Sequence, residues 1–356
     1  MRPVPLERNC PPQFYRGGHR ILAFRGEPAS DDENLREPED WLASTTALFV
    51  GGHGPSTLPD GRLLSEAIDA DPSDWLGPDH QLRFGMEPGL LVKLLDAAER
   101  LPVHAHPDQA FAARYLGSRH GKTEAWLVLD ADPDASVWLG FSDYVHAAEL
   151  RSLADAEGEE LLGLLHELPV RRGDAIVVPA GLPHAIGAGV FVLELQEPTD
   201  FSVMLERRRF DLAVEHAYLG LDVDVALRSV TRTPLELDAL EALRTRWVDD
   251  SGAAGQGVRS ALAVAADPYF RAEVIRSADA PVDLPAGFSV LVVVEGAGKL
   301  TASDGEMLDL ASGQVHVTPH ASGVLRLEGD TTVVRCQPPV GPHNRYTPAD
   351  APGTRQ

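Results

Sequence analysis

A series of short apolar runs, each of strand length and each bounded by glycine, proline or other turn residues, most constrains the fold of this chain. Strands of antiparallel sandwiches and barrels are short and are separated by such turns. The pattern therefore predicts a fold dominated by β-structure. The runs lie at residues 46–50, 90–95, 126–129, 136–141, 175–178, 189–195, 288–294, 306–310, 315–318, 323–327 and 331–335.

Helical patterns are fewer, and they fall between groups of strands. Asp108 precedes an alanine-rich stretch that ends at Gly117, which predicts a capped helix to about Ser118. Leucines at helical spacing predict a helical excursion near 142–167, and a second pattern follows Thr233 and Pro234 to about residue 246. The sequence thus predicts helical insertions in a β-protein.

The charge balance excludes several classes of partner. The 356 residues include 31 Lys and Arg against 54 Asp and Glu, a net charge of −23, which opposes binding to nucleic acid or to an anionic membrane. No apolar run approaches the about 20 residues of a membrane span, and the first residues do not read as a secretion signal. The isolated cysteines Cys10 and Cys336 suit a reducing compartment, so we expect a cytoplasmic protein.

Two segments share the spacing Gly, five residues, Pro: one runs from Gly173 to Pro179 and the other from Gly313 to Pro319. This repeated spacing predicts two related β-domains. We expect an N-terminal catalytic domain over 1–206 and a mainly helical connection over 207–250. A C-terminal domain without metal over 251–340 and a tail over 341–356 follow. The flexible composition of residues 249–257 marks the boundary between the domains.

Three motifs carry candidate metal ligands. His104 and His106 form His-x-His, which on a strand would place both imidazoles on one face. Glu124 ends the string Gly-Lys-Thr-Glu, and a turn rich in Gly and Pro leads to His184. Three imidazoles and one carboxylate suit one divalent metal ion. Each of these residues alone would be an ordinary strand or turn residue, but together they favour a metal site.

These motifs resemble the cupin double-stranded β-helix and, over roughly residues 90–200, the class I mannose-6-phosphate isomerase family. The residues that carry the resemblance read LLVKLLDAAERLPVHAHPD (90–108), GKTEAWLVLD (121–130) and VRRGDAIVVPAGLPHAIGAGVFVLELQEPTD (170–200). Weaker matches lie at Gly17-Gly18 and in EDWLAS at 39–44. The resemblance implies two cupin-type jelly-roll domains with helical insertions, the first of them catalytic. It also implies a zinc-dependent aldose–ketose isomerase that interconverts mannose 6-phosphate and fructose 6-phosphate.

Carried over residue by residue, the family's metal ligands fall on His104, His106, Glu124 and His184. Its active-site lysines fall on Lys93 and Lys122, its strand carboxylate on Glu194, and Asp200 matches a further family Asp. Abstraction of a proton next to a carbonyl needs a base, for which Glu194 is the candidate, with Lys122 as charge stabiliser or proton relay. The sequence does not decide between these roles.

The chain departs from the family at three positions: His104 replaces a Gln, Pro102 a Ser, and Met204 an Arg that serves the substrate. Neither Met nor Pro can donate a side-chain hydrogen bond to a phosphate. Arg207, Arg208 and Arg209 are a possible substitute or simply a solvated run. Three alternatives stay open: an isomerase of an unphosphorylated sugar, a sugar- or metal-binding cupin without turnover, and another iron- or manganese-dependent cupin enzyme.

Overall fold

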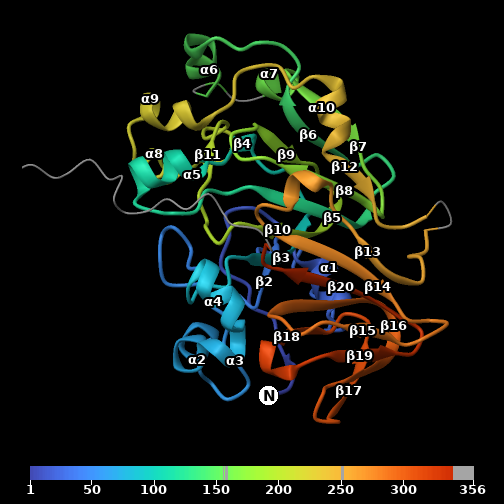
Figure 1. Ribbon diagram of the computed structural model, residues 1–356. Helices are drawn as coiled ribbons and strands as arrows, with labels where there is room; N and C mark the ends of the chain where they lie inside the picture. The colour runs from blue at the N-terminus through green and yellow to red at the C-terminus, as the bar shows by residue number, and fades with distance from the viewer. Residues whose placement is uncertain (155, 157–158, 250–251, 340–356) are drawn as a thin grey trace, which may run out of the picture.

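The computed structural model describes residues 1–154, 156, 159–249 and 252–339. Its strands pair into three sheets in which every strand pairing is antiparallel, which confirms the β-dominated fold (Figure 1). The predicted tail at 341–356 lies outside the described residues. The domain limits near 206 and 250 stay predictions.

Two sheets of the N-terminal part face each other across the candidate site, as contacts between Glu124 of one and His184 of the other show. The six-stranded sheet runs in the order β12 (Arg244–Arg246), β8 (Asp174–Val178), β5 (Glu124–Ala131), β10 (Val190–Gln196), β3 (Leu91–Ala97), β2 (Glu39–Leu42). The five-stranded sheet runs in the order β11 (Val203–Met204), β4 (His104–Ala105), β9 (His184–Ile186), β6 (Ser136–Phe141), β7 (Leu165–Pro169).

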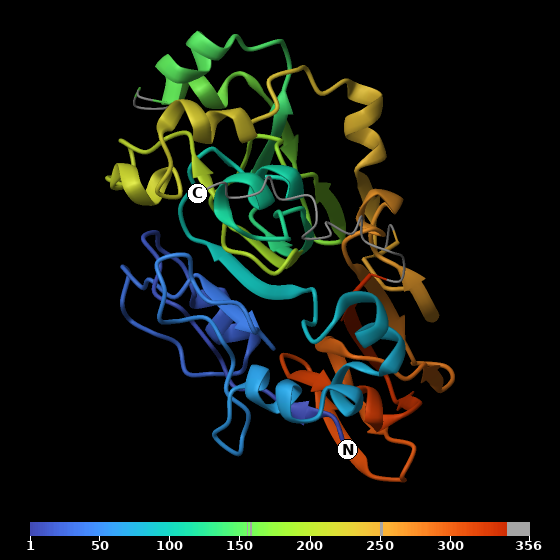
Figure 2. The same cartoon turned by 60° about the vertical axis from the view of Figure 1, so that its left-hand side comes forward.

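The third sheet has nine strands, and eight of them come from the C-terminal part of the chain. The ninth is β1 at the N-terminus, which pairs with β18 so that Val4 lies opposite Val317. Figure 2 shows the N-terminus beside the C-terminal strands. The nine strands are β1 (Val4–Pro5), β13 (Gly257–Ser260), β14 (Arg271–Arg276), β15 (Val282–Leu284), β16 (Ser289–Thr301), β17 (Met307–Ala311), β18 (Val315–Thr318), β19 (Leu325–Glu328) and β20 (Thr331–Gln337).

Most of the short helices lie towards the top and the lower left of Figure 1, and none of those described is long and apolar enough to cross a membrane. The N-terminal ones are α1 (His19–Phe24), α2 (Leu64–Ala70), α3 (Pro72–Leu76) and α4 (Pro78–Phe84). Those after β4 are α5 (Gln109–Phe111) with a π-turn over Ala112–Leu116, α6 (Ala147–Ala154), α7 (Glu159–Leu162), α8 (Val214–Ala217), α9 (Val223–Ala226) and α10 (Leu237–Ala242). Short 3-10 turns lie at Leu227–Ser229, Val264–Ala266 and His320–Ser322.

One apolar core joins the N-terminal and C-terminal parts. It includes Val92 and Leu127 of the six-stranded sheet together with Val290 and Val334 of the nine-stranded sheet, all at most 1% exposed. Side chains that alternate along each strand supply these residues to one face. The nine-stranded sheet therefore packs against the six-stranded sheet, which carries part of the candidate site.

Several predicted elements are correct, and two are wrong. Residues 136–141 and 315–318 are strands, and Asp108 caps α5 by accepting a hydrogen bond from the Phe111 N–H at 2.7 Å. Residues 46–50 form no strand, because the chain turns here: the Gly51 N–H donates to the Leu48 carbonyl at 2.7 Å, and Phe49 and Val50 are exposed. The helix after Thr233 is confined to α10, and residues 244–246 instead extend the sheet beside β8.

Candidate metal centre and active-site pocket

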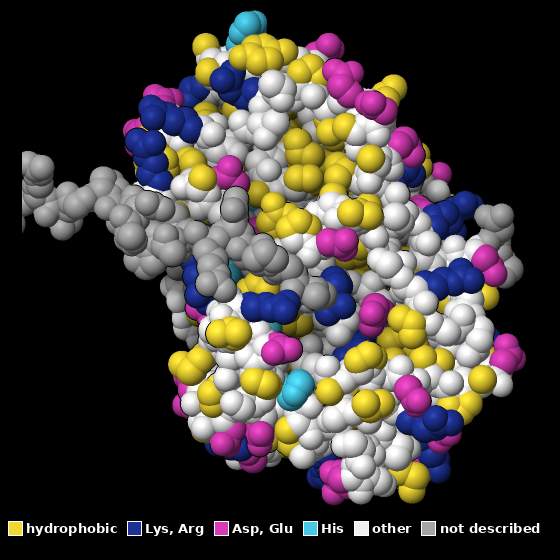
Figure 3. Space-filling model, in the orientation of Figure 1, with side chains coloured by type: hydrophobic (Ala, Val, Ile, Leu, Met, Phe, Trp, Pro, Cys, Tyr) yellow, Lys and Arg dark blue, Asp and Glu magenta, His cyan; other side chains and the backbone are white. Residues whose placement is uncertain are grey.

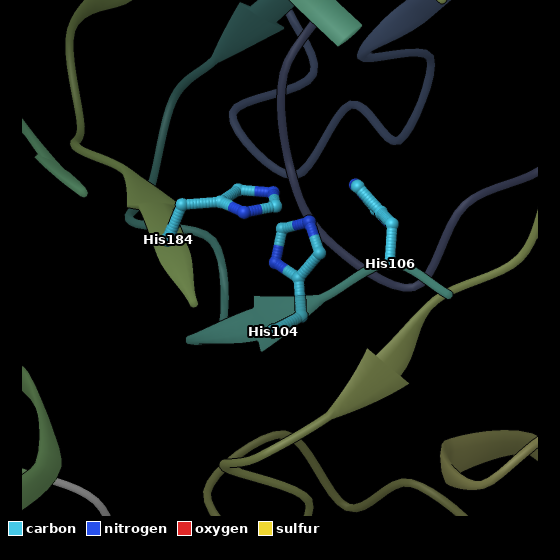
Figure 4. Close-up of side chains that lie close together, drawn as sticks. All are labelled: His104, His106 and His184. Atoms are coloured by element: carbon cyan, nitrogen blue, oxygen red, sulfur yellow. The ribbon is translucent and has the colours of Figure 1, made fainter. Parts of the chain in front are cut away.

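Three histidines converge between the two facing sheets. His104 in β4 lies directly opposite His184 in β9, and His106 follows β4 by one residue. The ring centroids are 4.2 Å apart for His104 and His184, 4.9 Å for His104 and His106, and 4.7 Å for His106 and His184. All three side chains are buried, and their candidate ligand nitrogens lie within 4.8 Å of one another (Figure 4). The structure thus brings together the histidines of the separate motifs.

Backbone carbonyls fix the orientation of all three rings. The Nδ1 atom of His104 donates to the Pro102 carbonyl, and that of His184 donates to the Leu182 carbonyl, each at 2.8 Å. The Nδ1 atom of His106 donates to the carbonyl of Phe201, also at 2.8 Å. A carbonyl oxygen can only accept, so each Nδ1 carries the proton and each Nε2 keeps its lone pair. This second-sphere arrangement is the one that metal-binding histidines use.

Glu124, the first residue of β5, faces two of these lone pairs. Its Oε2 atom is 2.9 Å from Nε2 of His106, and its Oε1 atom is 3.3 Å from Nε2 of His184. The Lys122 ammonium lies 3.2 Å from the same carboxylate and 3.1 Å from Nε2 of His106. The Nε2 atom of His184 is buried without a hydrogen-bond partner. The Lys122 ammonium neutralises part of this negative charge, and a metal ion between the histidine nitrogens and the carboxylate would pair the remaining electron pairs.

The protonation states fit metal binding. Burial, followed by the charges of the neighbouring histidines, lowers the pKa of His104 well below its ordinary value. Burial and the Lys122 charge lower the pKa of His106 to about 3. Burial alone would raise the pKa of Glu124, but Lys122 and His106 outweigh it and lower that pKa well below the ordinary value. His104 and His106 are therefore neutral imidazoles and Glu124 is an ionised carboxylate, which are donors that suit one divalent metal ion.

Two glycines hold the loops of this centre close together. A Cβ on Gly121, just before Lys122, would lie 2.7 Å from backbone atoms of Asp108 and Gln109. Gly181 adopts a left-handed φ of +90°, and its N–H donates to the His106 carbonyl at 2.7 Å. The turn that delivers His184 is thereby joined to the loop that carries His106.

A row of charged side chains crosses the six-stranded sheet beside the histidines. Lys93 in β3 lies directly opposite Glu194 in β10, with its Nζ atom 3.7 Å from Oε2 of Glu194 and 3.1 Å from Oε2 of Glu39. Glu39 also accepts hydrogen bonds from the Tyr15 hydroxyl at 2.5 Å and the Trp41 indole at 2.7 Å. The Lys93 ammonium stacks 4.6 Å from the Trp41 ring centroid.

Glu194 has a proton affinity suited to acid–base chemistry. Burial, followed by the charge of Glu124, raises its pKa to about 8, although Lys93 opposes the shift. The Trp126 indole donates to its Oε1 at 3.3 Å, which orients the carboxyl. A carboxyl group whose pKa lies near neutrality can both take up and return a proton.

One cavity of about 360 Å³ extends from His104 of the histidine cluster to this row. Its polar lining includes Glu39, Lys93, Lys122, Glu124, Glu194 and Asp200. The chain has three lysines, and two of them, Lys93 and Lys122, are buried in this cavity. The family-matched residues of distant segments are therefore assembled at one place.

Some residues of the pocket have no role that the sequence predicts. Glu39 is buried and is the first residue of the EDWLAS segment. The weak match of this segment to the family is the signal that could have identified Glu39 from the sequence. Nothing in the local sequence marks Tyr15. Asp200, whose pKa is raised by burial, accepts a hydrogen bond from the Phe49 N–H at 3.0 Å and lines the pocket. None of the arginines at 207, 208 and 209 is among the described lining residues.

Comparisons with known proteins agree with these motifs, although no family model matches the sequence. The chain is 35% identical over 194 residues to "Probable mannose-6-phosphate isomerase GmuF" of Bacillus subtilis, a match that covers 53% of this chain and 59% of that protein. It is 34% identical over 188 residues to mannose-6-phosphate isomerase of Streptococcus mutans, covering 52% of this chain and 54% of the relative. The matches thus span little more than half the length of these curated relatives.

Solved structures resemble the chain over almost its whole length. The mannose 6-phosphate isomerase of Bacillus subtilis superposes with a TM-score of 0.72 at 22% identity, covering 95% of this chain and 100% of that one. A mannose 6-phosphate isomerase bound with zinc and yttrium superposes with a TM-score of 0.73 at 16% identity, covering 96% of this chain and 100% of that one. The chain therefore shares the fold of these isomerases. Its curated relatives carry the same name, which confirms the resemblance to the class I mannose-6-phosphate isomerase family that the motifs indicated.

Proposed function

We propose that this protein is a metal-dependent aldose–ketose isomerase that interconverts mannose 6-phosphate and fructose 6-phosphate. The observation that carries the proposal is that His104, Glu124 and Glu194 line one pocket, with His184 in contact with Glu124 behind it. The names of the curated relatives support the substrate. A binding protein without turnover would not need a buried carboxyl with a pKa near neutrality.

The transfer of a carbonyl between C1 and C2 requires that a proton leave the carbon next to it and return to the neighbouring carbon. We propose that Glu194 takes up this proton and returns it. Trp126 and Lys93 hold the Glu194 carboxyl group in place. The Lys122 ammonium supplies positive charge where the substrate oxygen becomes negative. His104, His106, Glu124 and His184 would hold one divalent metal ion, for which zinc is proposed from the zinc-bound structural neighbour. When bound, such an ion polarises the substrate carbonyl as a Lewis acid.

Formation of fructose 6-phosphate from mannose 6-phosphate, with and without prior removal of metal by a chelator, tests the proposal. We expect activity that is lost on chelation and returns with zinc. Glu194→Gln should retain metal and lose about 10²–10⁴-fold in kcat, the usual contribution of a general acid–base group. An unchanged kcat in this variant would remove Glu194 from the reaction, and absence of turnover in the zinc-loaded protein would refute the function.

The cell compartment and partners are proposed from simpler observations. Cys10 and Cys336 are unpaired, which supports a reducing, cytoplasmic compartment. The net charge of −23 supports a protein that does not bind nucleic acid.

A further inference from the structure

We infer that Phe49 is a positioning residue that fixes the metal ligand His106 through its ring contact with Phe201. The inference rests on the proposed function, since it takes the three histidines and Glu124 as the ligands of one zinc ion. Phe49 is not one of these ligands. It lies in a loop and is 40% exposed, and its role follows from a series of contacts between that loop and the metal centre.

The hydrogen-bond partner of His106 differs in kind from those of the other two histidines. The Nδ1 atoms of His104 and His184 donate to carbonyls two residues earlier in the chain, so each ring is oriented within its own turn. The Nδ1 atom of His106 instead donates to the Phe201 carbonyl, 95 positions away. The Ser202 hydroxyl lies 3.3 Å from the same nitrogen. The orientation of His106 therefore depends on how firmly the segment around Phe201 is held.

The segment around Phe201 is fixed at both ends. Before it, the Thr199 hydroxyl donates to the Gly121 carbonyl at 2.7 Å. After it, the short strand β11 pairs with β4. The residues between these two points receive their contacts from the loop that carries Phe49.

Phe49 contacts the middle of this segment in two ways. Its ring makes an edge contact with the Phe201 ring, with 5.9 Å between the centroids and 77° between the ring planes. Aromatic rings attract each other in this arrangement. The Phe49 backbone N–H also donates to Oδ2 of Asp200 at 3.0 Å. The Phe201 carbonyl is thereby kept where it can accept the proton on Nδ1 of His106.

The loop that carries Phe49 is anchored to the six-stranded sheet. Leu48 is buried and packs with Trp41 of β2 and Leu91 of β3. The Leu48 N–H donates to the His53 carbonyl at 2.8 Å, which closes the loop. Phe49 lines both the active-site cavity and a second cavity of about 740 Å³. Its ring thus joins the sheet to the segment that orients a metal ligand, at the place where the two cavities adjoin.

The test measures zinc affinity by competition with a chromogenic chelator. Phe49→Ala removes the ring and keeps the backbone N–H that binds Asp200. An aromatic edge contact contributes about 2- to 12-fold to an equilibrium constant, which limits the possible effect. We expect Phe49→Ala to weaken zinc binding by about 3- to 10-fold. Phe49→Tyr keeps the ring and should bind zinc as the wild type does. An affinity within about twofold of the wild type in Phe49→Ala overturns the inference.

Tyr144→Ala is the matched control for the loss of an exposed ring. Tyr144 is 48% exposed and makes an edge contact of 5.0 Å with the His146 ring. It lines a different cavity, together with Leu150 of α6 and Asp224 of α9. Figure 3 shows Lys and Arg side chains gathered on the surface over α8 and α9. Tyr144→Ala should leave the zinc affinity unchanged, and equal losses in the two alanine variants would contradict the inference.

A double-mutant cycle isolates the contact between the two rings. Phe201→Leu removes the second ring and keeps the carbonyl, which belongs to the backbone. In the Phe201→Leu background, Phe49→Ala should change zinc affinity by less than about twofold, because the contact is already lost. Additive losses would contradict the inference.

The same samples separate this inference from the proposed function. If the wild-type protein binds zinc but does not turn over mannose 6-phosphate, the proposed isomerase is refuted, and the zinc affinities of the variants still decide the role of Phe49. A wild-type protein that binds no zinc refutes both.

Discussion

Replacement of Lys93 by Met removes a buried charge while it keeps most of the side-chain volume. The Lys93 side chain is 3% exposed, and its Nζ atom lies 3.1 Å from the carboxylate of Glu39 and 3.7 Å from that of Glu194. At an effective dielectric constant of about 20, these distances correspond to attractions of about 5 and about 4.5 kcal/mol. Several kcal/mol of desolvation cost for the ammonium offset them. We therefore expect a net loss of about 3–5 kcal/mol in the free energy of unfolding, the usual cost of leaving buried charges without their partner.

The exposed Lys299 provides the control for this prediction. Its Nζ atom lies 4.0 Å from Oδ1 of Asp309, and its side chain is 57% exposed. Exposed pairs contribute about 0–1 kcal/mol, so Lys299→Met should change stability by no more than that. The double variant Lys93→Met/Glu194→Gln should recover part of the loss of Lys93→Met, because it removes one of the two carboxylates that the lysine neutralised.

Urea unfolding followed by circular dichroism measures both variants, with metal content determined for each sample because a bound ion itself stabilises the folded state. If Lys93→Met and Lys299→Met unfold at the same urea concentration, Lys93 does not neutralise the carboxylates of Glu39 and Glu194, and the charge arrangement described for the pocket is wrong.

Four further predictions concern the metal, two protonation states and the lysines. His184→Ala should lose tightly bound metal by elemental analysis after dialysis, and a retained equivalent would contradict the ligand assignment. The rate of isomerisation should fall as the pH drops below about 8, because Glu194 acts as a base in its ionised form, and a flat profile down to pH 5 would contradict this role. Burial and Arg25 lower the pKa of His316 to about 4, below the ordinary 6.5, so the unfolded chain binds the extra proton between these values. Acidification across that window should cost about 3 kcal/mol of stability, less in His316→Gln, and equal losses in both proteins would contradict the assignment. Acetic anhydride should modify Lys299 much faster than the buried Lys93, as mass spectrometry of digests would show, and equal rates would contradict the burial.

The sequence by itself predicted most of the strands and the candidate ligands of the proposed metal centre. Alternating and β-branched runs such as 136–141 form strands because side-chain periodicity decides which face is buried. His104 and His106 share a short motif, and the turn before His184 is encoded by its own glycine and prolines. These features depend on residues close together in the chain, so their pattern is visible without a structure.

Other predictions failed or were incomplete because contacts distant in sequence decided them. Residues 244–246 follow a helical pattern, but the open edge of β8 pairs with them and makes them a strand. The N-terminal residues Val4 and Pro5 pair with β18, more than 300 positions away. Local propensity carries no information about such a partner, and burial against it outweighs the local preference.

The tertiary structure also decided the chemistry of the pocket. Lys93 and Glu194 belong to segments about 100 residues apart, yet the register of β3 and β10 places them directly opposite each other. The raised pKa of Glu194 arises from burial and from the charge of Glu124, and Met204 lies opposite His104 because β11 pairs with β4. The sequence thus determined which groups can bind a metal ion. Proton affinity and substrate contacts depend on the distances and dielectric surroundings that folding creates, and only the assembled sheets set these.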